Sequence, residues 1–390
     1  MKQILFLFAV LLKTALSAHA QSTFNLDSLI ASKATNFSGG NQFSGKSWDH
    51  LVERARSTGY VLIGEDHFIS EVPLFTRALM QNLKVDNYIC EMDQWTLDIF
   101  RDQIRSLTDA RLQSWISANY NGFSFFQKKN EFDLLPFLLK RNVNLIGIEQ
   151  VGLTWTTMSF QYLVDKGSQK NRKFYELMRD SSSIVNNVFL TDQSKPFFFQ
   201  SACFNTTMAK LDRSAMSKDE LALTTALIES AEIYKTGSHR RRIKLMQANM
   251  MSQYPHAFKG KKNVLKFGAN HTIKGESYLP VIDIGTTAHI MAQAENMDSY
   301  HILIMPKAGS QAGFLGGSSS ISLDDEPYRS LKPLFEKCSS TEWSMVDLEG
   351  IRSEVRKNKI AIKDPFLEKT LMGYDVLVVI PSATPAESLR

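Results

Sequence analysis

The hydrophobic pattern of the chain alternates between short apolar runs and longer amphipathic stretches. Apolar runs with the length of buried strands lie at residues 60–63, 87–90, 143–148, 263–267, 300–305 and 375–380. Stretches with helical spacing lie near the first three runs, at residues 48–56, 72–83, 96–118 and 133–140. Strands that alternate with helices over short connections predict an α/β fold, with a central, mainly parallel sheet flanked by helices.

Three other regions differ from this alternation. Residues 155–250 hold several helical patterns and no convincing strand, so we expect a helical insertion or cap over the sheet. Residues 21–47 are rich in Ser, Asn and Gly and predict a loosely ordered lead-in. The glycine- and serine-rich segment 309–320 predicts a flexible loop that could act as a lid. We therefore expect one α/β domain over residues 48–390.

The first twenty residues have the pattern of a secretory signal peptide. Lys2 gives a short basic start, residues 4–12 form an apolar run, and residues 18–20 supply a small-residue cleavage site. The apolar run is too short to cross a bilayer, and no later segment has the pattern of a transmembrane helix. We expect residues 1–20 to be removed and the mature protein to be periplasmic or extracellular.

Composition narrows the range of partners. Hydrophobic residues make up 43% and charged residues 22%, which is ordinary for a globular protein with a sizeable core. The net charge of +5 is too small to indicate a nucleic-acid partner, although residues 239–242 form one short basic run. The 3 cysteines do not make a disulfide scaffold. We expect a small-molecule substrate, no nucleic acid and no membrane span.

Acids and histidines follow the apolar runs. Glu65 and His67 come directly after the first run, Glu91 after the second and Glu149 after the third. His271 follows a later run in the same way. Ligands of parallel α/β sheets bind at the carboxyl ends of the strands, so we expect these side chains to gather at one edge.

Each of these residues also has an ordinary structural explanation. A histidine at a strand end is often held only by hydrogen bonds, and Glu65 could cap the next helix. If these side chains converge in the fold, a functional site is favoured over a structural role, because a histidine among carboxylates is held as an oriented base. Such a site could activate water by acid–base catalysis or bind a divalent metal, and the residues alone leave both open. No motif of a serine hydrolase, an H-E-x-x-H metalloprotease or a C-x-x-C site is present.

Several segments resemble the erythromycin esterase-like family over roughly residues 48–389. They are IGEDHFISEVPLFTRAL, DNYICEMD, NVNLIGIEQ, RIKLMQANM, GANHTIKG and YDVLVVIPSATPAESL. The resemblance implies a hydrolase-type α/β domain that cleaves an ester or lactone. It also implies that no cofactor is required, while a divalent metal or haem stays possible.

The resemblance implies roles for individual residues. His67 would be the general base that activates water, and Glu65 and Glu91 would orient it. Arg77 would pair with an acid of the site, and His271 would hold the substrate or stabilise the oxyanion. Neighbouring side chains expected to contact the substrate are Glu71, Asp93, Glu149, Arg242 and Asn270.

The first motif departs from the family pattern at one point. The family usually has two residues between its Glu and His, whereas only Asp66 separates Glu65 from His67. The resulting Gly-x-x-His, repeated at residues 268–271, is similar to a wider superfamily of haem-binding proteins and Tiki-type metalloproteases. That similarity implies a haem-binding protein as one alternative, with His67 and His271 as ligands and an apolar slot at residues 195–204. A second alternative is a metal-dependent peptidase that uses the same two histidines. A third is a member of the family with only a structural role.

Overall fold

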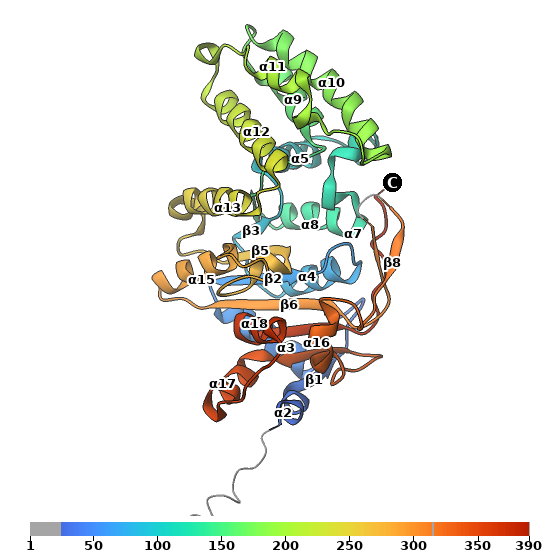
Figure 1. The fold of residues 1–390 in the computed structure, drawn as a ribbon, viewed down its shortest axis with the longest axis vertical. Helices are drawn as coiled ribbons and strands as arrows, with labels where there is room; N and C mark the ends of the chain where they lie inside the picture. Colours follow the sequence, from blue (N-terminus) through green and yellow to red (C-terminus); the bar gives the residue numbers. More distant parts are fainter. Residues whose placement is uncertain (1–24, 314–315, 390) are drawn as a thin grey trace, which may run out of the picture.

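A sheet of eight strands forms the centre of the molecule (Figure 1). The computed structural model describes residues 25–313 and 316–389, so the expected signal peptide lies outside the described residues. The strands are β1 (Ala34–Phe37), β2 (Tyr60–Glu65), β3 (Asn87–Cys90), β4 (Asn144–Gly147), β5 (Asn263–Gly268), β6 (Ser299–Pro306), β9 (Trp343–Asp347) and β10 (Val376–Ile380). Their order is β1-β9-β10-β6-β2-β5-β3-β4, and β9 runs opposite to its two neighbours. The other neighbouring pairs are parallel, which confirms the predicted α/β class.

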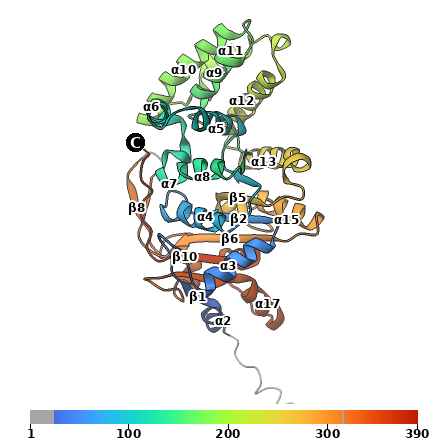
Figure 2. The same cartoon turned by 180° about the vertical axis from the view of Figure 1, so that it is seen from behind.

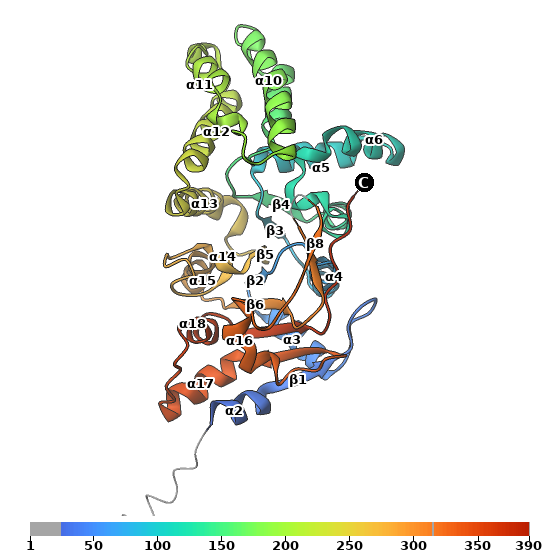
Figure 3. The same ribbon diagram turned by 45° about the vertical axis from the view of Figure 1, so that its right-hand side comes forward.

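Helices cover both faces of the sheet, because alternate strand residues are apolar on each side. One face packs against α3 (Lys46–Ser57), α4 (Glu71–Gln81), α7 (Lys129–Phe132) and α8 (Leu134–Lys140). The other face packs against α2 (Leu26–Lys33), α13 (His239–Gln253), α14 (Ala269–Thr272), α15 (Ile284–Ala294), α16 (Tyr328–Phe335), α17 (Leu348–Asn358) and α18 (Pro365–Gly373). Figure 3 shows α13, α15, α17 and α18 along one side of the sheet, with α4 on the other.

A helical arm extends beyond the β4 edge of the sheet (Figures 1 and 2). It consists of α9 (Thr156–Lys166), α10 (Arg172–Thr191), α11 (Ala202–Met208) and α12 (Lys218–Thr236), and it rests on α5 (Gln94–Ser106) and α6 (Asp109–Asn119). The arm has its own hydrophobic cluster, in which Phe160, Phe198 and Phe199 are fully buried. Residues 155–250 thus have the helical character that their pattern indicates.

Three segments differ from the structure that their sequence pattern predicts. The lead-in at 21–47 was expected to be loosely ordered, but it contains α2 and β1, and β1 pairs antiparallel with β9. A four-residue edge strand carries too little alternation to be recognised, although its Phe37 packs against Trp343. The helix expected over 96–118 is interrupted after Ser106, so that α5 and α6 are separate. The segment 309–320 is no simple loop, since β7 (Ser310–Ala312) pairs with β8 (Ser318–Ser320).

Among the described residues, none of the helices combines the length and apolar character needed to cross a membrane.

The sheet order brings the relevant strand ends together. Strands β2, β5, β3 and β4 are consecutive and parallel, so their carboxyl ends share one edge. Glu65 on β2 lies opposite Gly268 on β5, and Cys90, the last residue of β3, lies opposite Lys266. Glu91 therefore emerges beside both ends.

A buried lysine underlies this edge. The Lys266 ammonium lies 2.7 Å from a Glu65 oxygen and 2.6 Å from a Glu131 oxygen, and only 3% of the lysine side chain is exposed. The two carboxylates compensate the buried ammonium, and the ammonium in turn compensates two largely buried carboxylates.

Removing the lysine should destabilise the fold. We expect Lys266→Met to lower the free energy of unfolding by about 3–5 kcal/mol in chemical denaturation, because two carboxylates stay buried without their cation. The double variant with Glu131→Gln should recover part of this loss. Lys261→Met, at an exposed position, is the control. A change for Lys266→Met no larger than that of the control would contradict this account.

Candidate active site

The Glu91 carboxylate lies at the centre of the candidate site. Its Oε2 accepts a hydrogen bond from the Gly268 N–H at 3.0 Å and lies 3.7 Å from His67 Nε2. Its Oε1 accepts from Arg242 Nη2 at 2.7 Å and lies 3.7 Å from His271 Nε2. The two histidines, far apart in sequence, thus flank one buried carboxylate.

These neighbours keep Glu91 ionised. Burial alone would raise its pKa, but the charges of His271, His67 and Arg242 and the Gly268 N–H together lower the pKa well below its usual value. A carboxylate with so many donors is a fixed negative charge between two imidazoles.

His67 is oriented by Glu65. Their side chains meet at 2.8 Å between His67 Nδ1 and Glu65 Oε1, so Nδ1–H donates to the carboxylate and Nε2 points toward Glu91. The Phe125 ring lies 4.5 Å from the imidazole, measured between centroids, yet 28% of the His67 side chain is exposed. Burial would lower the pKa of His67, but the hydrogen bond to Glu65 and the charges of Glu91 and Glu65 outweigh it and raise the pKa.

Glu65 is held in turn by Lys266. Burial would raise the pKa of Glu65, but the Lys266 charge and the contacts with His67 lower it. Lys266 and Glu131 were missed by the sequence analysis. The one available signal was a lysine inside the apolar run of β5, where a buried charge requires a partner.

Arg242 supplies the cation of the site. It lies in the first turn of α13, and its guanidinium bridges Glu91 and Glu149, with Nε donating to Glu149 Oε2 at 3.0 Å. Arg77, which was expected to pair with an acid here, does not. It lies on the exposed face of α4, with its guanidinium 5.0 Å above the Phe137 ring, because α4 buries its other face.

His271 is fixed from the side away from Glu91. Its Nδ1 lies 3.0 Å from Asp283 Oδ2, and only 6% of the His271 side chain is exposed. Burial would lower the pKa of His271, but the hydrogen bond to Asp283 and the charge of Glu91 outweigh it and raise the pKa. Asp283 was missed from sequence, since nothing in the local pattern links it to His271.

The remaining expected residues lie around this centre or away from it. Glu71 accepts hydrogen bonds from the backbone and hydroxyl of Thr384 at 3.0 and 2.7 Å, so it holds the C-terminal segment. Asp93 accepts from Thr96 N–H and caps α5, and burial raises its pKa to about 7. Asn270 is exposed and lines a cleft with His67.

Two hollows open on either side of the His67–Glu91 pair. The first, of about 440 Å³, contains His67 and Asn270, and Tyr278 and Phe366 stack in its wall with 4.0 Å between ring centroids. The second, of about 330 Å³, contains Glu91 and Arg242. Its aromatic wall consists of Phe125, Trp155 and Tyr234. Polar groups at the centre with apolar walls are typical of small-molecule sites.

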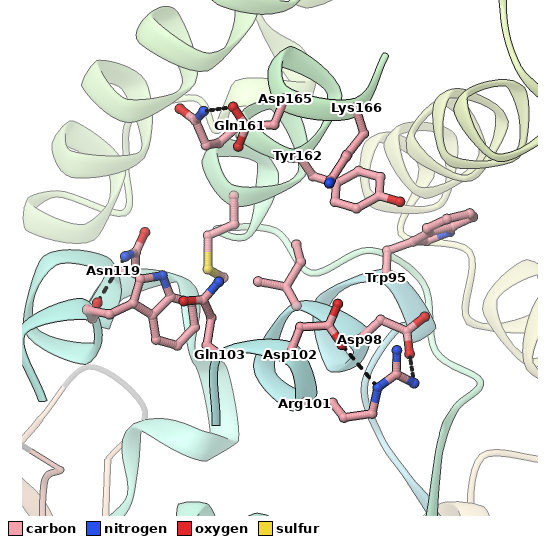
Figure 4. Close-up of a pocket in the computed structure, with 13 residues that line it drawn as sticks. Trp95, Asp98, Arg101, Asp102, Gln103, Asn119, Gln161, Tyr162, Asp165 and Lys166 are labelled. Carbon is pink, nitrogen blue, oxygen red and sulfur yellow. Dashed lines mark hydrogen bonds and ion pairs between the residues drawn. The ribbon is translucent and has the colours of Figure 1, made fainter. Parts of the chain in front are cut away.

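A separate pocket of about 440 Å³ lies where α5 and α6 face α9 (Figure 4). Trp95 and Tyr162 approach each other across it, and Arg101 pairs there with Asp98 and Asp102. None of the residues at the sheet edge lines this pocket. The carboxylate–histidine centre therefore identifies the candidate active site.

Solved structures share this fold. A mutant of the erythromycin esterase EreC in its open conformation matches with a TM-score of 0.58 and 13% identity, covering 91% of this chain and 98% of that one. A succinoglycan biosynthesis protein matches with 0.59 and 12%, covering 93% and 98%. A Bacillus cereus protein matches with 0.56 and 14%, covering 94% and 100%.

No family model matches the sequence, and no curated protein matches it. The comparisons therefore establish a shared fold over nearly the whole chain.

Gly268 lets His67 approach Glu91. A Cβ at this position would lie 2.8 Å from His67 Nε2 and 3.7 Å from Glu91 Oε2. We expect Gly268→Ala to displace the imidazole and to lower the pKa of His67 toward its usual 6.5, measured by NMR titration of the histidine rings.

Gly59→Ala is the matched control. The three atoms nearest to the added Cβ would all belong to the Met297 side chain, and Gly59 lies before the start of β2. An unchanged His67 titration in Gly268→Ala would contradict the placement of His67 against Glu91.

Proposed function

We propose that the protein is an exported hydrolase that cleaves an ester or lactone with a water molecule activated by His67. The observation that carries this proposal is the line Glu65–His67–Glu91, in which His67 Nδ1 is hydrogen-bonded to Glu65 and His67 Nε2 lies 3.7 Å from Glu91, with the imidazole lining the cleft. Such an arrangement fits a general base with a fixed tautomer.

In the proposed reaction, the water oxygen attacks the carbonyl carbon while His67 Nε2 takes a water proton. Glu65 and Glu91 stabilise the imidazolium that forms, because both carry negative charge beside it. When the tetrahedral intermediate collapses, the bond from carbon to the leaving oxygen breaks and the proton passes from His67 to that oxygen. The products are a carboxylic acid and an alcohol, or the opened hydroxy acid of a lactone.

Arg242 and His271 are the candidates for stabilising the oxyanion. Both lie beside Glu91, and the raised pKa of His271 favours its protonated form, which donates from Nε2. Positive donors preorganised in a buried site stabilise developing charge more than they would in water. The aromatic walls of the two hollows suit a substrate with apolar groups on either side of the scissile bond.

The haem alternative has less support from the site. The imidazole nitrogens of both His67 and His271 already face carboxylates. The apolar segment at 195–204, expected to form a slot, contributes Phe198, Phe199 and Phe204 to the arm's own core. Axial ligation would require these contacts to be rearranged.

Hydrolysis of a panel of chromogenic esters and macrocyclic lactones by the mature protein tests the proposal. We expect His67→Ala, in protein shown to be folded by circular dichroism, to reduce kcat/KM by about 10²–10⁴-fold, the usual contribution of a general base. His256→Ala, at an exposed position, is the control. Turnover that survives in His67→Ala, or no turnover of any substrate, would overturn the proposal.

The pH profile tests the partners of His67. The base acts only when neutral, so kcat/KM should fall as the pH drops through the raised pKa of His67. Glu91→Gln removes a negative charge 3.7 Å away, which lowers the pKa of His67 and should move this limb to lower pH. Glu342→Gln, an exposed acid, should leave the profile in place. A limb that does not move in Glu91→Gln would rule out the assignment of His67 as the titrating base.

A further inference from the structure

Three side chains meet behind His271, on the side away from Glu91. They are His239 in the first turn of α13, His271 on α14, and Asp283 at the start of α15. One nitrogen or oxygen atom of each lies within 4.8 Å of the others. The His239 and His271 rings are 5.7 Å apart between centroids.

His239 carries a buried nitrogen with no hydrogen-bond partner among the described residues. This atom is Nε2, and buried polar atoms without a partner are rare enough in proteins to suggest an ion or water beside them. A neutral imidazole nitrogen of this kind is the atom through which histidine binds metals.

Asp283 adds an anionic oxygen to the group. Its side chain is fully buried, with Oδ1 accepting from the Ile284 N–H at 2.7 Å and Oδ2 facing His271 Nδ1 at 3.0 Å. A carboxylate removed from water in this way requires a compensating cation or donors.

We propose that His239, His271 and Asp283 bind a divalent transition-metal ion of the zinc type. Two imidazoles and one carboxylate are a common donor set for zinc. At bond lengths of about 2.0–2.2 Å, tetrahedral ligand atoms lie about 3.3–3.5 Å apart. The three ligand atoms, which lie within 4.8 Å of one another, would therefore have to move by up to about 1.5 Å to bind the ion. The ion replaces the proton between His271 Nδ1 and Asp283, and that proton is released to solvent.

The surrounding charges permit a cation here. The nearest fixed positive charge, Arg242, is already neutralised by Glu91 and Glu149. Asp283 contributes an anionic oxygen to the three ligands.

The position of the ion separates it from the reacting atoms. His271 turns Nδ1 toward Asp283 and Nε2 toward Glu91, so the ion and Glu91 lie on opposite sides of the ring. The ion would fix the orientation of His271 without touching the substrate, much as outer-shell partners orient ligands. This consequence rests on the proposed hydrolase function, whereas the metal site does not.

Cobalt titration of the mature, tag-free protein tests the site. After treatment with a chelator and dialysis, we expect one equivalent of Co²⁺ to bind with the visible absorption of a low-symmetry site, and Zn²⁺ to displace it. His239→Ala should weaken binding by more than about 100-fold, beyond the range seen for loss of an outer-shell partner. His239→Cys should restore binding and add a thiolate-to-cobalt band. His289→Ala, which changes another half-buried histidine, should bind as the wild type does.

One further variant separates the two proposals. His67→Ala should retain wild-type cobalt affinity while it loses hydrolysis, because His67 is not among the three ligands. Equal cobalt affinity in the wild type and in His239→Ala, both shown to be folded by circular dichroism, would overturn the metal site. No specific cobalt binding by the folded wild type would overturn it as well.

Discussion

One buried negative charge, the carboxylate of Glu91, organises the candidate site of this molecule. With 8% of its side chain exposed, Glu91 requires compensation from within the protein. The compensation comes from three separate segments: the turn after β2 brings His67, the end of β5 and α14 bring Gly268 and His271, and α13 brings Arg242. Helix α13 directly follows the helical arm in the chain. The ion pair between Arg242 on α13 and Glu91 therefore also anchors the end of the arm to the sheet.

Charges alternate outward from this centre. Glu131, Lys266, Glu65 and His67 form a line of contacts of 2.6–2.8 Å under the sheet edge. Buried ion pairs contribute little net stability compared with apolar packing, so such a line is costly unless each member has both partners. The line instead orients its members. Lys266 holds the Glu65 carboxylate, and Glu65 in turn fixes the direction of the His67 ring.

The periodicity of the sequence is sufficient to predict the parallel core and the edge at which the acids and histidines gather. Short apolar runs gave six of the strands, and the strand ends indicated Glu65, His67, Glu91, Glu149 and His271. The antiparallel strands β1 (Ala-Thr-Asn-Phe) and β9 (Trp-Ser-Met-Val-Asp) were not predicted, because polar residues interrupt both of these short segments. The partners Lys266–Glu131 and His271–Asp283 depend on tertiary contacts. Arg77 and Arg242 both lie in amphipathic stretches, and only the packing of the two helices decides which one reaches an acid.

The low identity to the solved structures suggests how function can vary on this fold. At 12–14% identity the core keeps its layers, because apolar side chains of similar volume can replace one another. The edge is less tolerant, since each buried charge there depends on a partner of opposite sign. In this chain Phe125, Trp155 and Tyr234 come from segments at or beside the arm, so the arm contributes to the walls of the cleft while the sheet edge carries the carboxylates and histidines.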